Sequence, residues 1–111
     1  MADARVVAAR LWHFAAHHAA SRGYVFGDGV EQMLPMQAKQ MARLVLDRAQ
    51  AERVPEEGMI RLAEGNLATF IDAMIEAAHQ ERGYLESRGP VIGEVTWGAA
   101  ISRLCPLFPI C

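Results

Sequence analysis

The chain is short of cysteine and has no long apolar run. Its two cysteines both fall in the last seven residues, so no disulfide framework holds the rest of the chain together. Charged residues or histidine interrupt every apolar stretch before it reaches the roughly 20 residues that span a bilayer. We therefore expect no membrane span and a cytoplasmic location.

The chain also lacks a strong charge of either sign. Its formal net charge is -2, and its 11 Lys and Arg residues are spread along the whole length rather than clustered. Binding to nucleic acid needs a basic patch that neutralises phosphates, so no nucleic-acid partner is expected. A length of 111 residues, without an internal repeat or a shift in composition, favours a single domain over residues 1–111.

Apolar residues recur at helical spacing along most of the sequence, which predicts an all-α fold. The pattern indicates a helical bundle of three long amphipathic helices, a short C-terminal helix and an apolar tail containing proline and cysteine. The first helix is expected over about residues 4–22, with Asp3 as its N-cap and Gly23 at its C-terminal end. The segment from Tyr24 to Gly29 is predicted to be a turn.

The second helix is expected from about Val30 to Glu52. Either a short turn precedes Pro35 or, as we favour, Pro35 lies in the first turn of the main helix, where proline is tolerated. Its predicted inward residues are Leu34, Met41, Leu44, Val45 and Ala49. The third helix follows Pro55, begins with an acidic turn and ends at Gly83. Its predicted inward residues are Ala63, Leu67, Phe70, Ile71, Met74 and Ala78. The short C-terminal helix is marked by Trp97, Ile101 and Leu104.

Four residues are candidate metal ligands. His13 and His17 are four apart on the first predicted helix, so both rings lie on one face. Glu76 and His79 have the E-x-x-H spacing of carboxylate-bridged metal bundles. On a helical wheel, however, this pair falls away from the apolar stripe, and the chain has no second E-x-x-H. We therefore expect no cofactor, with a divalent metal ion as the alternative and a site shared between subunits left open.

His18 lies within the apolar stripe of the first helix. We predict that it is partly buried and hydrogen-bonded to a neighbouring helix, with a catalytic role as the alternative. No nucleophile motif or phosphate-binding glycine loop accompanies it, so enzymatic activity is not favoured. The third helix region has a net charge of -4 from six acidic and two basic residues, which is either solvated or faces a basic partner.

The C-terminal end is unusually apolar, because no charged side chain follows Arg103. Leaving this segment in water would forfeit on the order of 10 kcal/mol of apolar burial. It either folds back to close the open side of the bundle or docks onto another subunit or partner. The residues expected to carry an interaction are Trp97, Ile101, Leu104, Leu107, Phe108 and Ile110.

Cys105 and Cys111 allow a third interpretation of the same segment, based on the chemistry of their thiols. The two thiols could form a disulfide across a short loop, or be sites of enzymatic modification. In this respect the tail resembles ribosomally made peptide precursors, in which a helical leader precedes a cysteine-containing core. That resemblance covers the tail alone.

We therefore predict a small helical module that acts by protein–protein contact, as a homo-oligomer or as a regulatory or immunity-type partner, without catalysis. The alternatives are a metal-binding carboxylate and histidine bundle, and a precursor protein that is modified at its C-terminal cysteines.

Overall fold

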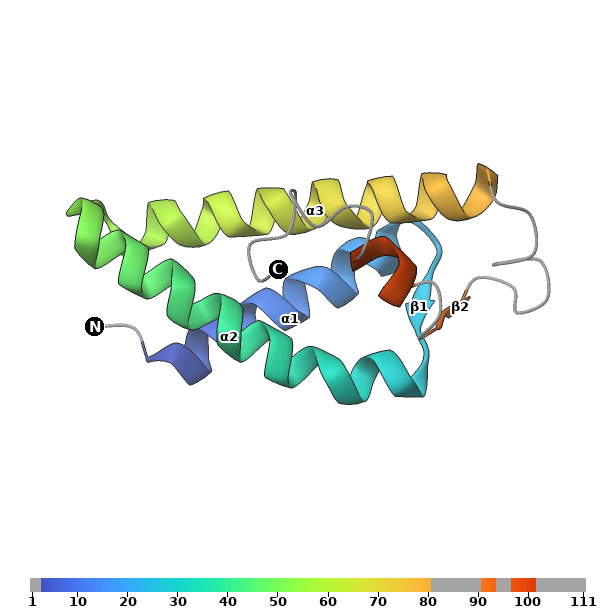
Figure 1. Cartoon of the computed structure of the whole chain (residues 1–111), viewed down its shortest axis with the longest axis horizontal. Helices are drawn as coiled ribbons and strands as arrows, with labels where there is room; N and C mark the ends of the chain where they lie inside the picture. The colour runs from blue at the N-terminus through green and yellow to red at the C-terminus, as the bar shows by residue number, and fades with distance from the viewer. Residues whose placement is uncertain (1–2, 81–90, 94–96, 102–111) are drawn as a thin grey trace.

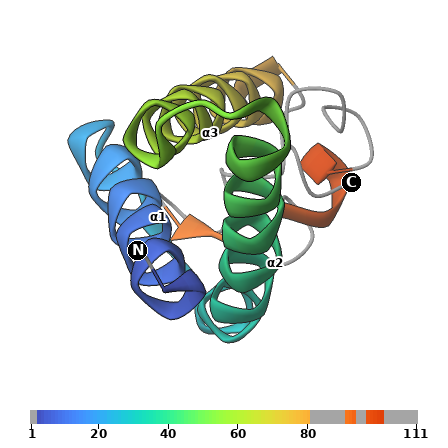
Figure 2. The ribbon, with the colours of Figure 1, turned by 90° about the vertical axis from the view of Figure 1, so that its left-hand side faces the viewer.

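The structure, a computed structural model, describes residues 3–80, 91–93 and 97–101, and the side chains of residues 77–80 are not among those described. The elements are α1 (Ala4–Ser21), β1 (Val25–Phe26), α2 (Asp28–Glu52), α3 (Glu56–Gln80) and β2 (Val91–Ile92). Residues 97–101 form the C-terminal helix. Figure 1 shows the three long helices side by side, and the end-on view in Figure 2 places them at the corners of a triangle. The predicted all-α fold is confirmed.

The ends of α1 form as the sequence predicts. Asp3 is the N-cap, and its side chain accepts a hydrogen bond from the Arg5 backbone N–H. At the other end, Gly23 has a φ of 82°, and Tyr24 N–H donates to the carbonyl of Ala19 at 2.9 Å. This left-handed geometry satisfies the last helical carbonyls and suits glycine, which has no Cβ to clash.

The turn after α1 holds a short strand that the sequence pattern does not reveal. β1 pairs in parallel with β2, with Val25 opposite Val91 and Phe26 opposite Ile92. The Gly27 N–H extends this pairing by donating to the Ile92 carbonyl at 2.8 Å. The pair ties the segment before α2 to the segment that leads toward the C-terminal helix.

The core is a single apolar cluster contributed by all three long helices, both strands and the C-terminal helix. Small residues let the helices approach closely, since Ala19 and Ala42 are fully buried. The largest fully buried side chains are Trp97, Phe70, Leu11, Met41, Ile71, Met74, Ile92, Val7 and Val30. Within the part of the chain that the structure describes, no helix is long and apolar enough to cross a membrane.

Two predictions about α2 are wrong. Pro35 does not lie in the first turn, because the helix begins at Asp28 and Pro35 lies inside it. Starting early buries Val30 and Leu34, and each buried aliphatic side chain contributes about 1.5–3 kcal/mol. Together these contributions match or exceed the cost of about 3 kcal/mol for a proline inside a helix. Asp28 is the first residue of the helix, after the N-cap Gly27.

Leu44 is the second correction, because it was expected to face inward and is instead 47% exposed. Its neighbour Val45 is buried. One residue turns a helix by 100°, so Leu44 lies at the edge of the buried stripe of α2 rather than on its centre. There it faces the side of α3, where nothing among the described residues covers it fully.

Candidate interaction surface

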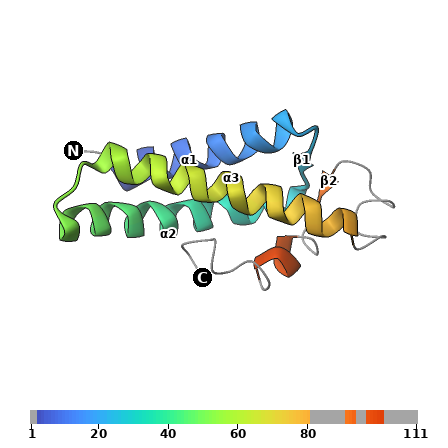
Figure 3. The ribbon, with the colours of Figure 1, turned by 90° about the horizontal axis from the view of Figure 1, so that it is seen from above.

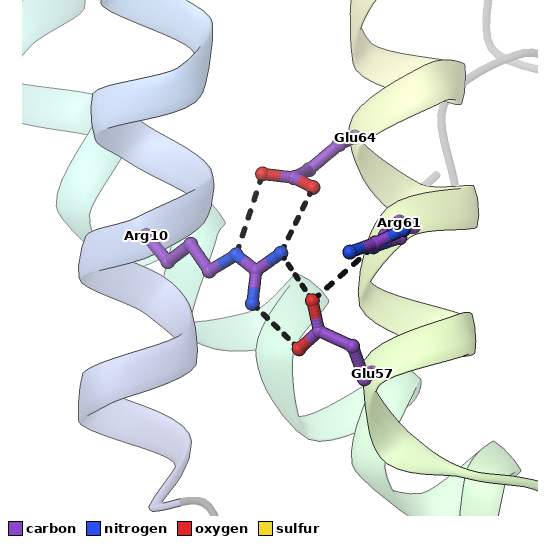
Figure 4. A network of polar contacts seen from close by, with 4 residues as sticks. All are labelled: Arg10, Glu57, Arg61 and Glu64. Carbon is purple, nitrogen blue, oxygen red and sulfur yellow. Dashed lines mark hydrogen bonds and ion pairs between the residues drawn. The ribbon is translucent and has the colours of Figure 1, made fainter.

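The α1–α3 side of the bundle is closed by a network of ion pairs around Arg10. Its guanidinium donates two hydrogen bonds of 2.7 Å to the Glu57 carboxylate and two longer ones to Glu64, as Figure 4 shows. The hydrogen bonds from Arg10, supported by Arg61, lower the pKa of Glu57 to about 2. Arg10, whose pKa is raised mainly by its bonds to Glu57, is held in its charged form.

A second polar contact lies on the same side, further along both helices. His18 Nε2 is 2.9 Å from Asp72 Oδ1, and a carboxylate can only accept, so the ring N–H donates. Arg22 Nε donates to the same oxygen at 3.0 Å. Burial raises the pKa of Asp72, but these hydrogen bonds outweigh it and the net shift is downward. The prediction that His18 is partly buried and bonded to a neighbouring helix is confirmed.

The acidic charge of α3 is thus partly neutralised by ion pairs with basic residues of the same chain. Glu57 and Glu64 pair with Arg10 of α1, and Asp72 pairs with His18 of α1 and with Arg22 at its C-cap. The partners are 47 to 54 residues apart in sequence. Sequence spacing does not reveal these pairs, because they depend on how α1 and α3 align. The α1–α3 side is therefore occupied by internal contacts and is a poor candidate for a binding surface.

The α2–α3 side is covered at one end by the C-terminal helix, which lies beside both long helices in Figures 2 and 3. Trp97 is 1% exposed, and its ring meets Phe26 and Phe70 edge-on at centroid distances of 5.6 and 5.4 Å. Its indole N–H donates to Gln37 Oε1 at 3.0 Å. The apolar ring of Trp97 is therefore buried against other aromatic rings, and its one polar atom has a hydrogen-bond acceptor.

Beyond this end, the same side contains an open groove of about 390 Å³, here called the α2–α3 groove. Two of its apolar residues are largely uncovered, since Leu44 is 47% and Leu62 is 56% exposed. The groove is lined by Leu44, Val45, Asp47, Arg48, Ala51, Met59, Leu62, Ala63 and Asn66. Exposed apolar side chains that face one another from two helices are typical of a surface that buries a partner.

The polar residues of the α2–α3 groove carry no net charge. Asp47 and Arg48 contribute one charge of each sign, and Asn66 is neutral. Arg48 also pairs with Glu52 one turn along α2, at 2.8 Å. The groove therefore does not select a partner of strongly basic or acidic character.

The candidate metal ligands do not form a described cluster. His13 and His17 on α1 and Glu76 on α3 are exposed, and His13 stacks on Trp12. The side chain of His79 lies outside the described residues. Within residues 3–80, 91–93 and 97–101, no three His, Cys, Asp or Glu side chains are placed to share a metal ion. Metal binding by these residues stays a prediction.

The six expected interaction residues divide into two groups. Trp97 is a core residue, so its burial within the chain removes it from the accessible surface, and Ile101 is partly buried against the same core. The other four, Leu104, Leu107, Phe108 and Ile110, lie outside the described residues. So do Cys105 and Cys111, and their modification or disulfide stays a prediction.

Sequence reasoning missed the exposed apolar residues of the α2–α3 groove. Leu62 lies off the apolar stripe of α3, and a lone apolar residue on a polar face carries no signal. Leu44 was assigned to the core because the adjacent α2 stripe is continuous. Only the alignment of α2 with α3 shows that the two leucines line one groove.

Comparison of the chain with protein-family models, with curated proteins and with solved structures found no match in any of the three.

Proposed function

We propose that this protein is a non-catalytic interaction module that associates with a second copy of itself through the α2–α3 groove. The observation that carries the proposal is the pair of exposed leucines, Leu44 and Leu62, that line the open part of this groove. Burying such side chains in an interface removes their apolar surface from water, which is favourable.

The charges of the groove favour a second copy over a partner of different character. In a twofold-symmetric dimer each surface meets an identical one, so acids and bases must be present on the same surface. Asp47 and Arg48 meet this requirement, because they give the groove one acidic and one basic side chain.

The experiment compares two single variants by sedimentation velocity over a range of protein concentrations. Leu62→Gln replaces an apolar residue in the groove, whereas the matched control, Met36→Gln, replaces one on the outer face of α2 that is 69% exposed and does not line the groove. Leu62→Gln removes one leucine from each copy, so the dimer loses about 1.5 kcal/mol of apolar burial per copy and about 3 kcal/mol in all, which is about a hundredfold in Kd. We expect that loss for Leu62→Gln and no change for Met36→Gln.

Two results would count against the proposal. A wild-type chain that stays monomeric at every concentration would exclude self-association and would favour a regulatory or immunity-type partner. A dimer that Leu62→Gln leaves intact would place the contact elsewhere on the molecule.

A further inference from the structure

The α2–α3 groove continues the surface on which the C-terminal helix already lies. Trp97 contacts Gln37 and Phe70, and the groove begins seven residues further along α2 and four residues back along α3. At 1.5 Å per residue these offsets are about 10 and 6 Å, so the two sites adjoin. The C-terminal helix therefore covers one part of a longer apolar surface and leaves the next part open.

The chain that follows this helix has the length and the chemistry to cover the rest. Ten residues, 102–111, follow Ile101 and lie outside the described residues. An extended chain spans about 3.3 Å per residue, so ten residues can reach about 33 Å, several times the offset of about 10 Å between the Trp97 contacts and the groove. The segment 104–110 has no charged side chain and offers Leu107 and Phe108 to an apolar surface.

We infer that segment 104–110 occupies the α2–α3 groove of its own chain in the monomer and competes there with the second copy. The inference rests on the proposed function, because the competition matters only if the groove is the contact surface between copies. A segment tethered next to its site has a high effective concentration, which favours binding within one chain. Association then requires the segment to leave.

Disulfide trapping tests where the segment lies. Asn66→Cys places a thiol in the groove of the full-length chain, and Ala16→Cys on the exposed side of α1 is the matched control. Each is made with Cys105→Ser and, separately, with Cys111→Ser, so that one native thiol remains. The proteins are oxidised at low concentration and the bonds are mapped on non-reducing gels and by peptide mass spectrometry.

We expect an intramolecular bond between position 66 and a native thiol of the same chain, in greater yield than for the Ala16→Cys control. Covalent dimers in which position 66 of one copy is bonded to the native thiol of the other would overturn the inference, because the segment would then come from the second copy. Equal yields in the Asn66→Cys and Ala16→Cys proteins would overturn it as well.

A second measurement is the affinity between copies of the Phe108→Asp variant. This affinity changes in opposite directions depending on whether the segment lies in the groove of its own chain or in that of the second copy. Phe108→Asp in the full-length chain weakens docking of the segment, so the groove opens and association strengthens. If the segment covers the groove in about nine of ten monomers, and it must leave both copies of the dimer, the apparent affinity rises about a hundredfold. Weaker association of Phe108→Asp would overturn the inference. Leu62→Gln tests the proposed function, that the groove is the contact surface between copies. Phe108→Asp tests whether the segment occupies that groove, so failure of the inference is distinguishable from failure of the proposed function.

Discussion

Replacing Trp97 with alanine should destabilise the whole bundle. Its side chain is 1% exposed and links α2, α3 and β1 through Gln37, Phe70 and Phe26. Truncating a buried tryptophan to alanine costs about 3–5 kcal/mol. At about 4 °C per kcal/mol for a domain near 100 residues, the melting temperature should fall by about 12–20 °C.

Two further variants separate the contributions of the indole. Trp97→Phe keeps an aromatic ring against Phe26 and Phe70 but loses volume and the hydrogen bond to Gln37, so we expect a cost of about 1–2 kcal/mol. Gln37→Ala removes only the acceptor of the indole N–H, and we expect about 1–2 kcal/mol from the buried donor it leaves unpaired.

The assay is urea unfolding followed by far-ultraviolet circular dichroism, which reports the long helices rather than the indole itself. If the C-terminal helix belongs to the cooperative core, Trp97→Ala shifts the single transition of the long helices. A cost below about 1 kcal/mol would refute this reasoning, because it would show that the bundle folds without the C-terminal helix.

Two further predictions concern the ion pair between Arg10 and Glu57 and the packing of the core at Ala42. Because Arg10 holds the folded-state pKa of Glu57 at about 2, below its ordinary value of 4.5, the stability from this pair is present above pH 4.5 and is lost as the pH falls toward 2. In Arg10→Met, the free energy of unfolding should depend less steeply on pH between 4.5 and 2, as measured by urea unfolding at a series of pH values. An unchanged slope in this range would contradict the ion pair between Arg10 and Glu57. Ala42 is fully buried in α2, so Ala42→Leu should overpack the core and destabilise the fold by about 1–3 kcal/mol in thermal unfolding, whereas a neutral effect would indicate unfilled space there.

Local signals in the sequence were sufficient for the helices and their ends. Asp3 and Gly23 bracket α1 because an N-cap and a left-handed C-terminal glycine act within a few residues. His18 could be placed for a similar reason, since its position on the apolar stripe implies burial, and a buried ring nitrogen needs a partner.

The features that the sequence did not reveal depend on contacts between distant segments. Pro35 was placed in a first turn because a proline inside a helix is locally destabilising, whereas in the fold the burial of Val30 and Leu34 offsets that cost. The parallel pair of β1 and β2 joins segments 66 residues apart and only two residues long, so no alternation marks either strand. The α2–α3 groove has the same origin, because Leu44 and Leu62 lie on different helices.

The most direct test of the α2–α3 groove as the contact surface is a dilution series of the uniformly labelled, full-length protein followed by amide chemical shifts. The account predicts concentration-dependent shifts for the groove-lining residues within 44–51 and 59–66, and none on the outer face of α1 around Val6, which is 65% exposed. Shifts centred on α1, or none at any concentration, would contradict it.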